Sequence, residues 1–209
     1  ANFVCLEALA SYNIAFFLAS APMMLGRALD KAVLFPLYAR RPPDASDSNR
    51  QKINQARRAI TGVLMAGLAV FALFGDALVR VLYDERYHDA APLIILVAVA
   101  ALPSLIVATY PSLPLAMGNS RRYTVLMVAQ AVLLVALTYV GARAYGVVGA
   151  ILAQPVGTML FYPALVAGVR PTGGWDPSHD GLYAGLALMV AALVLIVHPG
   201  FASWLIAQL

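Results

Sequence analysis

The chain has 209 residues, of which 62% are hydrophobic and only 11% are charged, and its mean hydropathy is +0.80. A soluble domain is roughly half apolar and about a quarter charged, so this composition excludes an ordinary water-soluble globule. The net charge of +4 comes from basic residues that flank apolar stretches. This placement indicates membrane topology rather than binding to nucleic acid.

Six stretches lack Asp, Glu, Lys and Arg, and each is close to the roughly 20 residues that a helix needs to cross a bilayer core. We predict an all-α integral membrane protein with six transmembrane helices, forming a single membrane domain over residues 1–209. Too few residues remain for an appended soluble catalytic domain. The predicted spans are approximately residues 8–38, 59–83, 90–116, 123–142, 145–169 and 181–198.

The first predicted span carries charged residues near one end. Arg27, Asp30 and Lys31 lie about one helical turn apart, and Asp30 can pair with Arg27. Charged groups inside a membrane usually face a partner or a wet cavity. We therefore treat these three residues and Asn13 as candidate substrate-binding residues, with the two cations facing an anionic headgroup. In the alternative interpretation, Arg27 and Lys31 only extend to the headgroups of the lipids.

A basic loop over residues 39–58 follows this span. Positive loops stay on the cytoplasmic side of a membrane, so we predict that this loop is cytoplasmic. Pro42 and Pro43 end the preceding helix, and Ser48 with Gln51 three residues later matches a capping box. We expect a new helix to run from about Ser48 into the second span.

Alternation from this loop places residues 118–122 and 170–180 in the cytoplasm and residues 84–89 outside. Most of the basic loop residues then lie on the cytoplasmic side. The apolar run from 90 to 120 is too long for one straight helix, and the prolines in 110–114 predict a break near its cytoplasmic end.

The second span contains Asp76 and Arg80, which are spaced to form an i,i+4 ion pair. We interpret this pair as structural, with a proton-coupling carboxylate as the alternative.

The sequence predicts no metal site, because His88, His179 and His198 fall in different loops or helix ends and the single Cys5 matches no metal spacing. No nucleotide-binding or hydrolase motif occurs. We therefore expect no cofactor and no enzymatic activity.

Four short motifs occur in an order that resembles one family of transporters. They are Leu34-Phe35-Pro36 before a basic residue, the turn over residues 81–87, the turn over residues 115–121, and Tyr145-Gly146 followed by Gly149-Ala150. In the turn at 81–87, Asp84 stands where glycine is common. The chain is similar to the C-terminal half of polysaccharide-biosynthesis flippases in the multidrug/oligosaccharidyl-lipid/polysaccharide exporter superfamily.

This resemblance implies one half of a two-bundle transporter in the bacterial cytoplasmic membrane. The partners it implies are membrane lipids, a lipid-linked glycan substrate, and an N-terminal half of the same protein, with no nucleic acid. The function it implies is the flipping of lipid-linked oligosaccharide or exopolysaccharide precursors by alternating access.

Three other functions remain open at this stage. A cation-coupled multidrug antiporter would need a carboxylate in its cavity, for which Asp30 is the candidate. A membrane-embedded glycan enzyme and a purely structural subunit are the other two.

Overall fold

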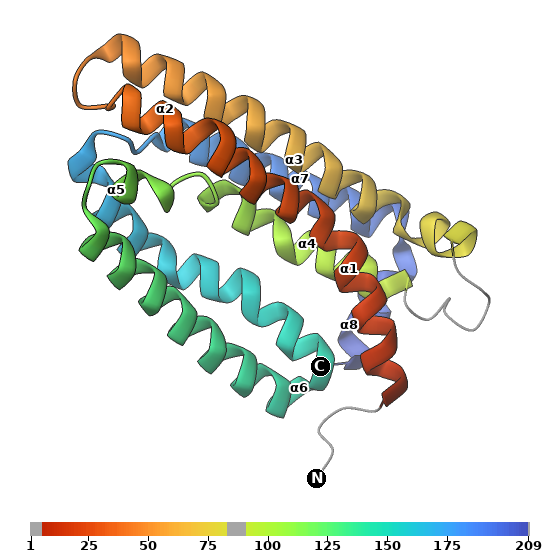
Figure 1. Cartoon of the computed structure of the whole chain (residues 1–209). Helices are drawn as coiled ribbons and strands as arrows, with labels where there is room; N and C mark the ends of the chain where they lie inside the picture. The colour runs from red at the N-terminus through yellow and green to blue at the C-terminus, as the bar shows by residue number, and fades with distance from the viewer. Residues whose placement is uncertain (1–5, 83–90, 209) are drawn as a thin grey trace.

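The computed structural model describes residues 6–82 and 91–208, and in this part of the chain every regular element is helical (Figure 1). Side chains are described for residues 16, 17, 20–81 and 91–208. The elements are α1 (Leu6–Leu29), η1 (Asp30–Leu34), α2 (Phe35–Arg40), α3 (Asp47–Leu82), α4 (Ala91–Val107), α5 (Ser112–Ala116), α6 (Ser120–Val169), η3 (Arg170–Thr172), α7 (Pro177–Val197) and α8 (Pro199–Gln208).

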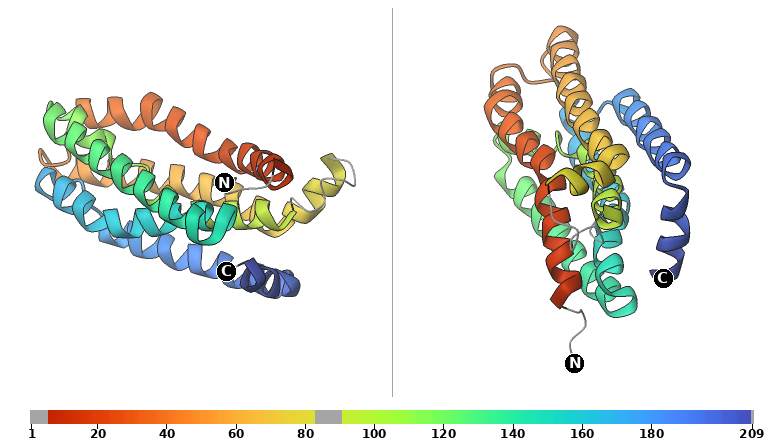
Figure 2. Two further views of the ribbon diagram at one scale, coloured as in Figure 1. Left: turned by 90° about the horizontal axis from the view of Figure 1, so that it is seen from below. Right: turned by 90° about the vertical axis from the view of Figure 1, so that its right-hand side faces the viewer.

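The long helices form a bundle around α4 (Figures 1 and 2). The sequence of α4 is apolar on all sides, and a helix of this kind is stable only when it is covered on all sides. In agreement, α4 contacts α1, α3, α6 and α7, and most of its side chains are buried. The surrounding helices expose many apolar side chains, such as Phe17, Val132 and Leu188.

The 50 residues of α6 form two antiparallel legs, residues 120–144 and 147–169 (Figure 1). Between them Tyr145 has a non-helical backbone and Gly146 has φ of 58° and ψ of −136°. Such a conformation is almost restricted to glycine. Gly141 and Gly149 meet backbone to backbone beside this turn, and further along Gly168 packs on Leu126.

Four of the described helical segments are long and apolar enough to cross a membrane. One of them, Ser120–Thr172, is the α6 hairpin and so contains two legs. The predicted break at 110–114 is confirmed, because α4 ends at Val107 and α5 begins at Ser112. The predicted loop at 84–89, together with His88, lies outside the described residues.

The three loops predicted to be cytoplasmic gather at one end of the bundle, which we call the basic-loop end (residues 41–46, 117–119 and 170–176; Figure 1). Gly173 lies against the backbone of Asp44, and Gly174 lies against Leu113 at the start of α5. The turn at Tyr145 and Gly146 and the start of α8 lie at the opposite end, which we call the hairpin end.

The helix predicted to begin at about Ser48 is present, but its cap is different. The helix α3 begins at Asp47, and the Ser46 hydroxyl accepts a hydrogen bond from the Asn49 N–H at 3.2 Å. The capping residue is therefore Ser46 rather than Ser48. The region expected to be a basic loop, 39–58, is consequently helical from Asp47 onward, and only residues 41–46 connect α2 to α3.

Candidate functional site

The candidate residues of the first span lie at a widened turn of the helix. The segment from Leu6 to Arg40 is helical throughout, but η1 is a π-helical turn in which the Phe35 N–H donates to the Asp30 carbonyl. Pro36 explains this widening, because it has no N–H and its ring displaces the carbonyl four residues earlier. Such π-helical turns often occur at functional sites.

The Asp30 carboxylate points to another helix rather than to a cation of its own. Its Oδ1 accepts a hydrogen bond from the Ser112 hydroxyl at 2.7 Å, which connects η1 to α5. Arg27 and Lys31 form no ion pair with Asp30, and both side chains are exposed. Asn13 lies within α1, and its side chain is outside the described residues.

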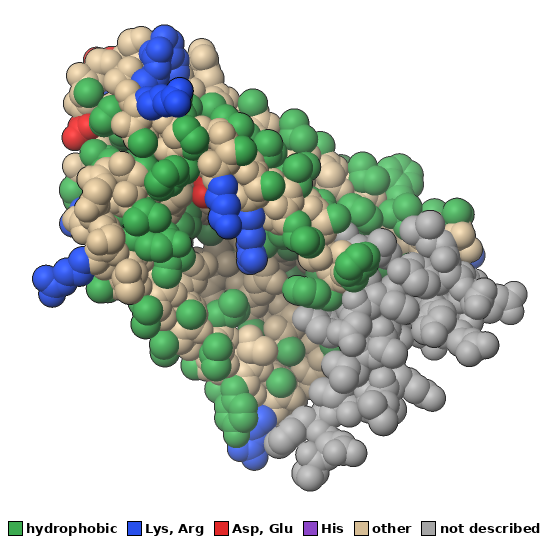
Figure 3. Space-filling view, in the orientation of Figure 1, with side chains coloured by type: hydrophobic (Ala, Val, Ile, Leu, Met, Phe, Trp, Pro, Cys, Tyr) green, Lys and Arg blue, Asp and Glu red, His purple; other side chains and the backbone are tan. Residues whose placement is uncertain are grey.

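A hollow separates α1 from the first leg of α6 (Figure 3). The two helices make few contacts with each other, although both contact α4. Basic side chains extend over the edge of this hollow from the side of α1, with an acidic side chain beside them. The basic residues of the segment 6–39 are Arg27 and Lys31. The edge of the hollow on the side of α1 is therefore cationic.

The structure contains the ion pair between Asp76 and Arg80, with 3.0 Å between Oδ2 and Nη2. Both side chains are partly exposed, at 39% and 65%. The pair lies in the last two turns of α3, at the hairpin end of that helix. Exposed pairs of this kind contribute little to stability, typically less than about 1 kcal/mol.

A second polar region, the buried polar cluster (Tyr38, Arg57, Thr61, Tyr110, His179 and Asp180), lies near the basic-loop end. At its centre, the guanidinium of Arg57 is fully buried. It donates to the Gly174 carbonyl at 2.7 Å and to the Tyr38 hydroxyl at 3.0 Å, and it lies 4.2 Å from the centre of the Tyr110 ring. Its Nε has no hydrogen-bond partner among the described residues.

Burying an unpaired guanidinium is costly, so its surroundings must compensate. Charge-assisted hydrogen bonds and the aromatic faces of two tyrosines provide the compensation. The Tyr38 hydroxyl in turn donates to the Thr109 carbonyl at 2.7 Å. Arg57 thus connects α2, α3, the segment between α4 and α5, and the loop that precedes α7.

Asp180 is the acceptor of this cluster. Its carboxylate receives hydrogen bonds from the hydroxyls of Tyr110 and Tyr162, both at 2.6 Å, and from the Trp175 indole at 3.1 Å. The His179 ring lies 2.9 Å away through Nδ1 and contacts Thr61 at 3.0 Å through Nε2. A carboxylate with so many partners has all its lone pairs satisfied, so the cluster fixes α3, α6, α7 and the segment between α4 and α5 relative to one another.

Asp176 caps α7 at the edge of this cluster. Its Oδ1 accepts from the N–H groups of Ser178 and His179, and its Oδ2 pairs with Arg58 at 3.3 Å. Burial alone would raise the pKa of Asp176, but the hydrogen bonds from Ser178 and His179 and the charge of Arg58 outweigh it. The pKa of this carboxyl therefore lies below its usual value.

Arg57 falls in the region 39–58 that was predicted to be a basic cytoplasmic loop, and no sequence pattern predicted the buried polar cluster. One signal was present, because Arg57 falls in the apolar stripe formed by Ile53, Ile60 and Leu64 at helical spacing. An arginine in that stripe indicates a buried cation. The partners of Asp180 come from segments far apart in the chain, so no local pattern identifies them.

Comparisons with protein-family models, with curated proteins and with solved structures find no match for this chain. Its function must therefore be argued from its own residues. Among the described residues no group of His, Cys, Asp and Glu side chains could hold a metal ion. His179 and His198 lie at opposite ends of α7.

Proposed function

We propose that this chain is a six-span membrane bundle that forms the C-terminal half of a flippase for lipid-linked oligosaccharide or exopolysaccharide precursors. Four long apolar segments support its insertion in a membrane. The two legs of the α6 hairpin and the helix from Leu6 to Arg40 would complete six spans. The basic-loop end would then face the cytoplasm, because it carries most of the basic loop residues.

The observation that carries the proposal is the pair of exposed cations, Arg27 and Lys31, on the segment α1–η1 that borders the hollow. A phosphate-bearing sugar headgroup cannot cross about 30 Å of hydrocarbon without a polar path. Cations beside the hollow provide a place for its negative charge. The lipid tail would remain in the surrounding bilayer.

The helix that carries these cations also has the features of a moving element. Pro22 lies within α1, and η1 interrupts the regular hydrogen bonding beside Asp30. Interrupted helices at membrane depth form binding sites and hinges in transporters. The hydrogen bond between Asp30 and Ser112 connects η1 to α5, so η1 can serve as the fixed end about which α1 tilts.

The test is a flipping assay with the full-length native protein in liposomes that contain a fluorescent lipid-linked glycan. We expect Arg27→Ala with Lys31→Ala to abolish most of the flipping. Arg40→Ala with Arg41→Ala is the matched control, because it removes two exposed cations from the basic-loop end, and it should retain flipping. Undiminished flipping by the first variant would remove these cations from the site, and absence of flipping by the wild type would contradict the function.

A cation-coupled drug antiporter is the second candidate, and one observation favours it. Asp30 is a half-buried carboxylate on the segment that borders the hollow. If this carboxylate couples transport to cation movement, Asp30→Asn should abolish drug resistance in cells. In the flippase, the same substitution should leave glycan flipping largely intact.

A further inference from the structure

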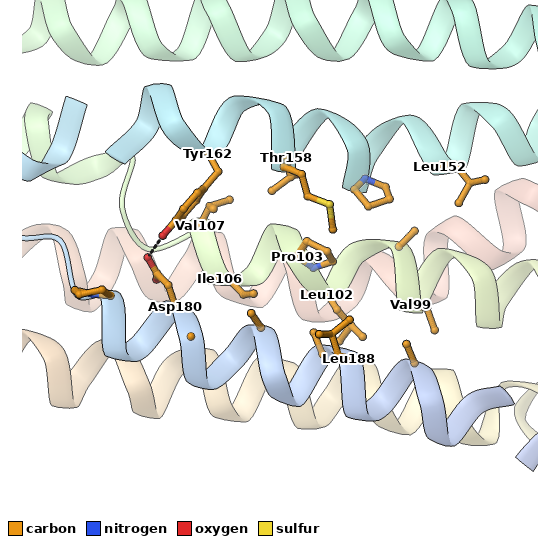
Figure 4. A pocket seen from close by; sticks show the side chains of 18 residues that line it. Val99, Leu102, Pro103, Ile106, Val107, Leu152, Thr158, Tyr162, Asp180 and Leu188 are labelled. Atoms are coloured by element: carbon orange, nitrogen blue, oxygen red, sulfur yellow. Dashed lines mark hydrogen bonds between the residues drawn. The ribbon is translucent and has the colours of Figure 1, made fainter. Parts of the chain in front are cut away.

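An elongated cavity of about 710 Å³ lies between α4, the second leg of α6, and α7 (Figure 4). Its walls are almost entirely apolar, with residues such as Val99, Leu152 and Leu188 along its length. Its polar lining side chains include Thr158, Tyr162 and Asp180. A cavity of this size with a few polar groups has the character of a ligand site.

The shape of the cavity follows from small residues on α7. Gly181, Ala184, Ala187 and Ala191 line it at intervals of three or four residues, so they form one face of the helix. Because these side chains are short, α7 leaves a long space beside α6. From Asp180 to Ala191 this space extends about 16 Å along the axis at 1.5 Å per residue.

One end of the cavity is closed by polar groups. The Tyr162 hydroxyl from α6 donates to the Asp180 carboxylate from α7 at 2.6 Å, as Figure 4 shows. Trp175 donates to the same carboxylate, and the Arg170 guanidinium lies 5.8 Å from the centre of the Trp175 ring. The carboxylate of Asp180 is buried and fully hydrogen-bonded, so its negative charge does not face the surroundings. The exposed charge at this end of the cavity is the positive charge of Arg170.

We propose that this cavity holds one acyl chain of an anionic membrane phospholipid, whose phosphate lies against Arg170 beside Trp175. The proposal rests on the membrane placement in the proposed function but not on transport. It assigns the cavity to a resident lipid of the bundle.

The choice of occupant follows from the charge and from the surroundings. Met159 and Leu188, which line the cavity, are also exposed, so the opening faces the same medium as the outer surface of α6 and α7. In a bilayer that medium is hydrocarbon, and an apolar space open to it is filled by acyl chain rather than by water. Arginine and tryptophan at the membrane interface then complement an anionic headgroup.

The test is native mass spectrometry of the full-length protein, purified in mild detergent and titrated with phosphatidylglycerol or phosphatidylcholine. We expect one tightly retained phosphatidylglycerol. Ala184→Phe inserts a ring into the cavity and should lower its apparent affinity about tenfold, because it displaces about two methylene groups of the acyl chain. Ala192→Phe, on an exposed position of α7 outside the cavity lining, should leave binding unchanged.

Arg170→Gln should lower the affinity for phosphatidylglycerol about fivefold and leave that for phosphatidylcholine unchanged. If Ala184→Phe and Ala191→Phe both retained phosphatidylglycerol as tightly as the wild type, the cavity would not be the lipid site. Equal binding of both lipids by the wild type would overturn the role of Arg170. A protein that holds this lipid but flips no glycan would contradict the proposed function alone, and absence from the membrane fraction would contradict the membrane placement.

Discussion

The two ends of the bundle are held together by different chemistry. At the basic-loop end, Arg57 and Asp180 connect α2, α3, α6, α7 and the segment between α4 and α5 through largely buried hydrogen bonds. At the hairpin end, the polar contacts of the described residues are sparser. They include the Asp76–Arg80 pair within α3 and a contact of 3.0 Å between the His198 ring and the Leu73 carbonyl.

This difference has a mechanical consequence. Buried hydrogen bonds have preferred lengths and directions, so they fix one arrangement of the helices that share them. Apolar packing against α4 is less directional and allows helices to tilt or slide. We therefore expect the basic-loop end to remain rigid while the spacing of the helices changes at the hairpin end.

The largest expected loss of stability comes from removing the charge of Arg57 at the basic-loop end. Arg57→Met keeps an apolar stem of similar length but leaves the Gly174 carbonyl and the Tyr38 hydroxyl without their donor. We expect a destabilisation of about 3 kcal/mol, measured as a lower midpoint of thermal unfolding in detergent. Arg58→Met is the control, since this neighbouring side chain is 46% exposed. Equal midpoints for the two variants would show that the cluster does not stabilise this end.

The second effect concerns the turn at the hairpin end, where packing rather than hydrogen bonding brings two helices together. A Cβ at residue 141 would meet the backbone carbonyl of Gly149, so Gly141→Ala must push the two legs of α6 apart. We expect a loss of about 2 kcal/mol. Gly185→Ala adds a methyl group to open space on α7 and should stabilise slightly, by less than about 1 kcal/mol. Similar unfolding midpoints for Gly141→Ala and Gly185→Ala would contradict the close approach of the two legs of α6.

Much of the fold could be predicted because charge-free runs and proline positions are local signals. The break predicted at 110–114, the helix that begins near Ser48 and the turn between the predicted spans 123–142 and 145–169 all follow from residues adjacent in the sequence. The N-cap residue of α3 was predicted as Ser48 but is Ser46. Both serines lie within two residues of the start of the helix, and a sequence motif does not distinguish between them.

The candidate site was predicted only in part. The cations Arg27 and Lys31 were identifiable because charge in an apolar segment is rare. Ser112, the partner of Asp30, was not predicted, because it is distant in the sequence. Local spacing favoured Arg27 instead, which lies one helical turn before Asp30. Asp180 was counted as a loop residue at a membrane edge, because its partners converge only when α6, α7 and the segment between α4 and α5 pack together.

A pH titration can test how much Asp176 contributes to the stability of the basic-loop end. Its pKa is lowered in the fold, so it stabilises the folded state above the ordinary value of about 3.9 and loses this contribution as the pH falls through the lowered value. Asp176→Asn preserves the helix cap but cannot ionise. We expect its unfolding midpoint to fall less than that of the wild type between about pH 6 and about pH 3.

Asp44→Asn is the control for this titration, because Asp44 is exposed in the loop that lies against Gly173. Its midpoint should follow the wild type at every pH. If Asp176→Asn also followed the wild type, the acid sensitivity of this end would come from other carboxyls.

The smallest expected effect is at the hairpin end. Asp76→Asn removes an ion pair between partly exposed side chains of one helix, and such pairs contribute about 0.5 kcal/mol. The unfolding midpoint should therefore change little, and far less than in Arg57→Met, because both partners lie on α3. If Asp76 instead couples transport to a proton, Asp76→Asn would abolish transport in the liposome assay while leaving the unfolding midpoint unchanged. That result would move the working carboxylate from the hollow to the hairpin end.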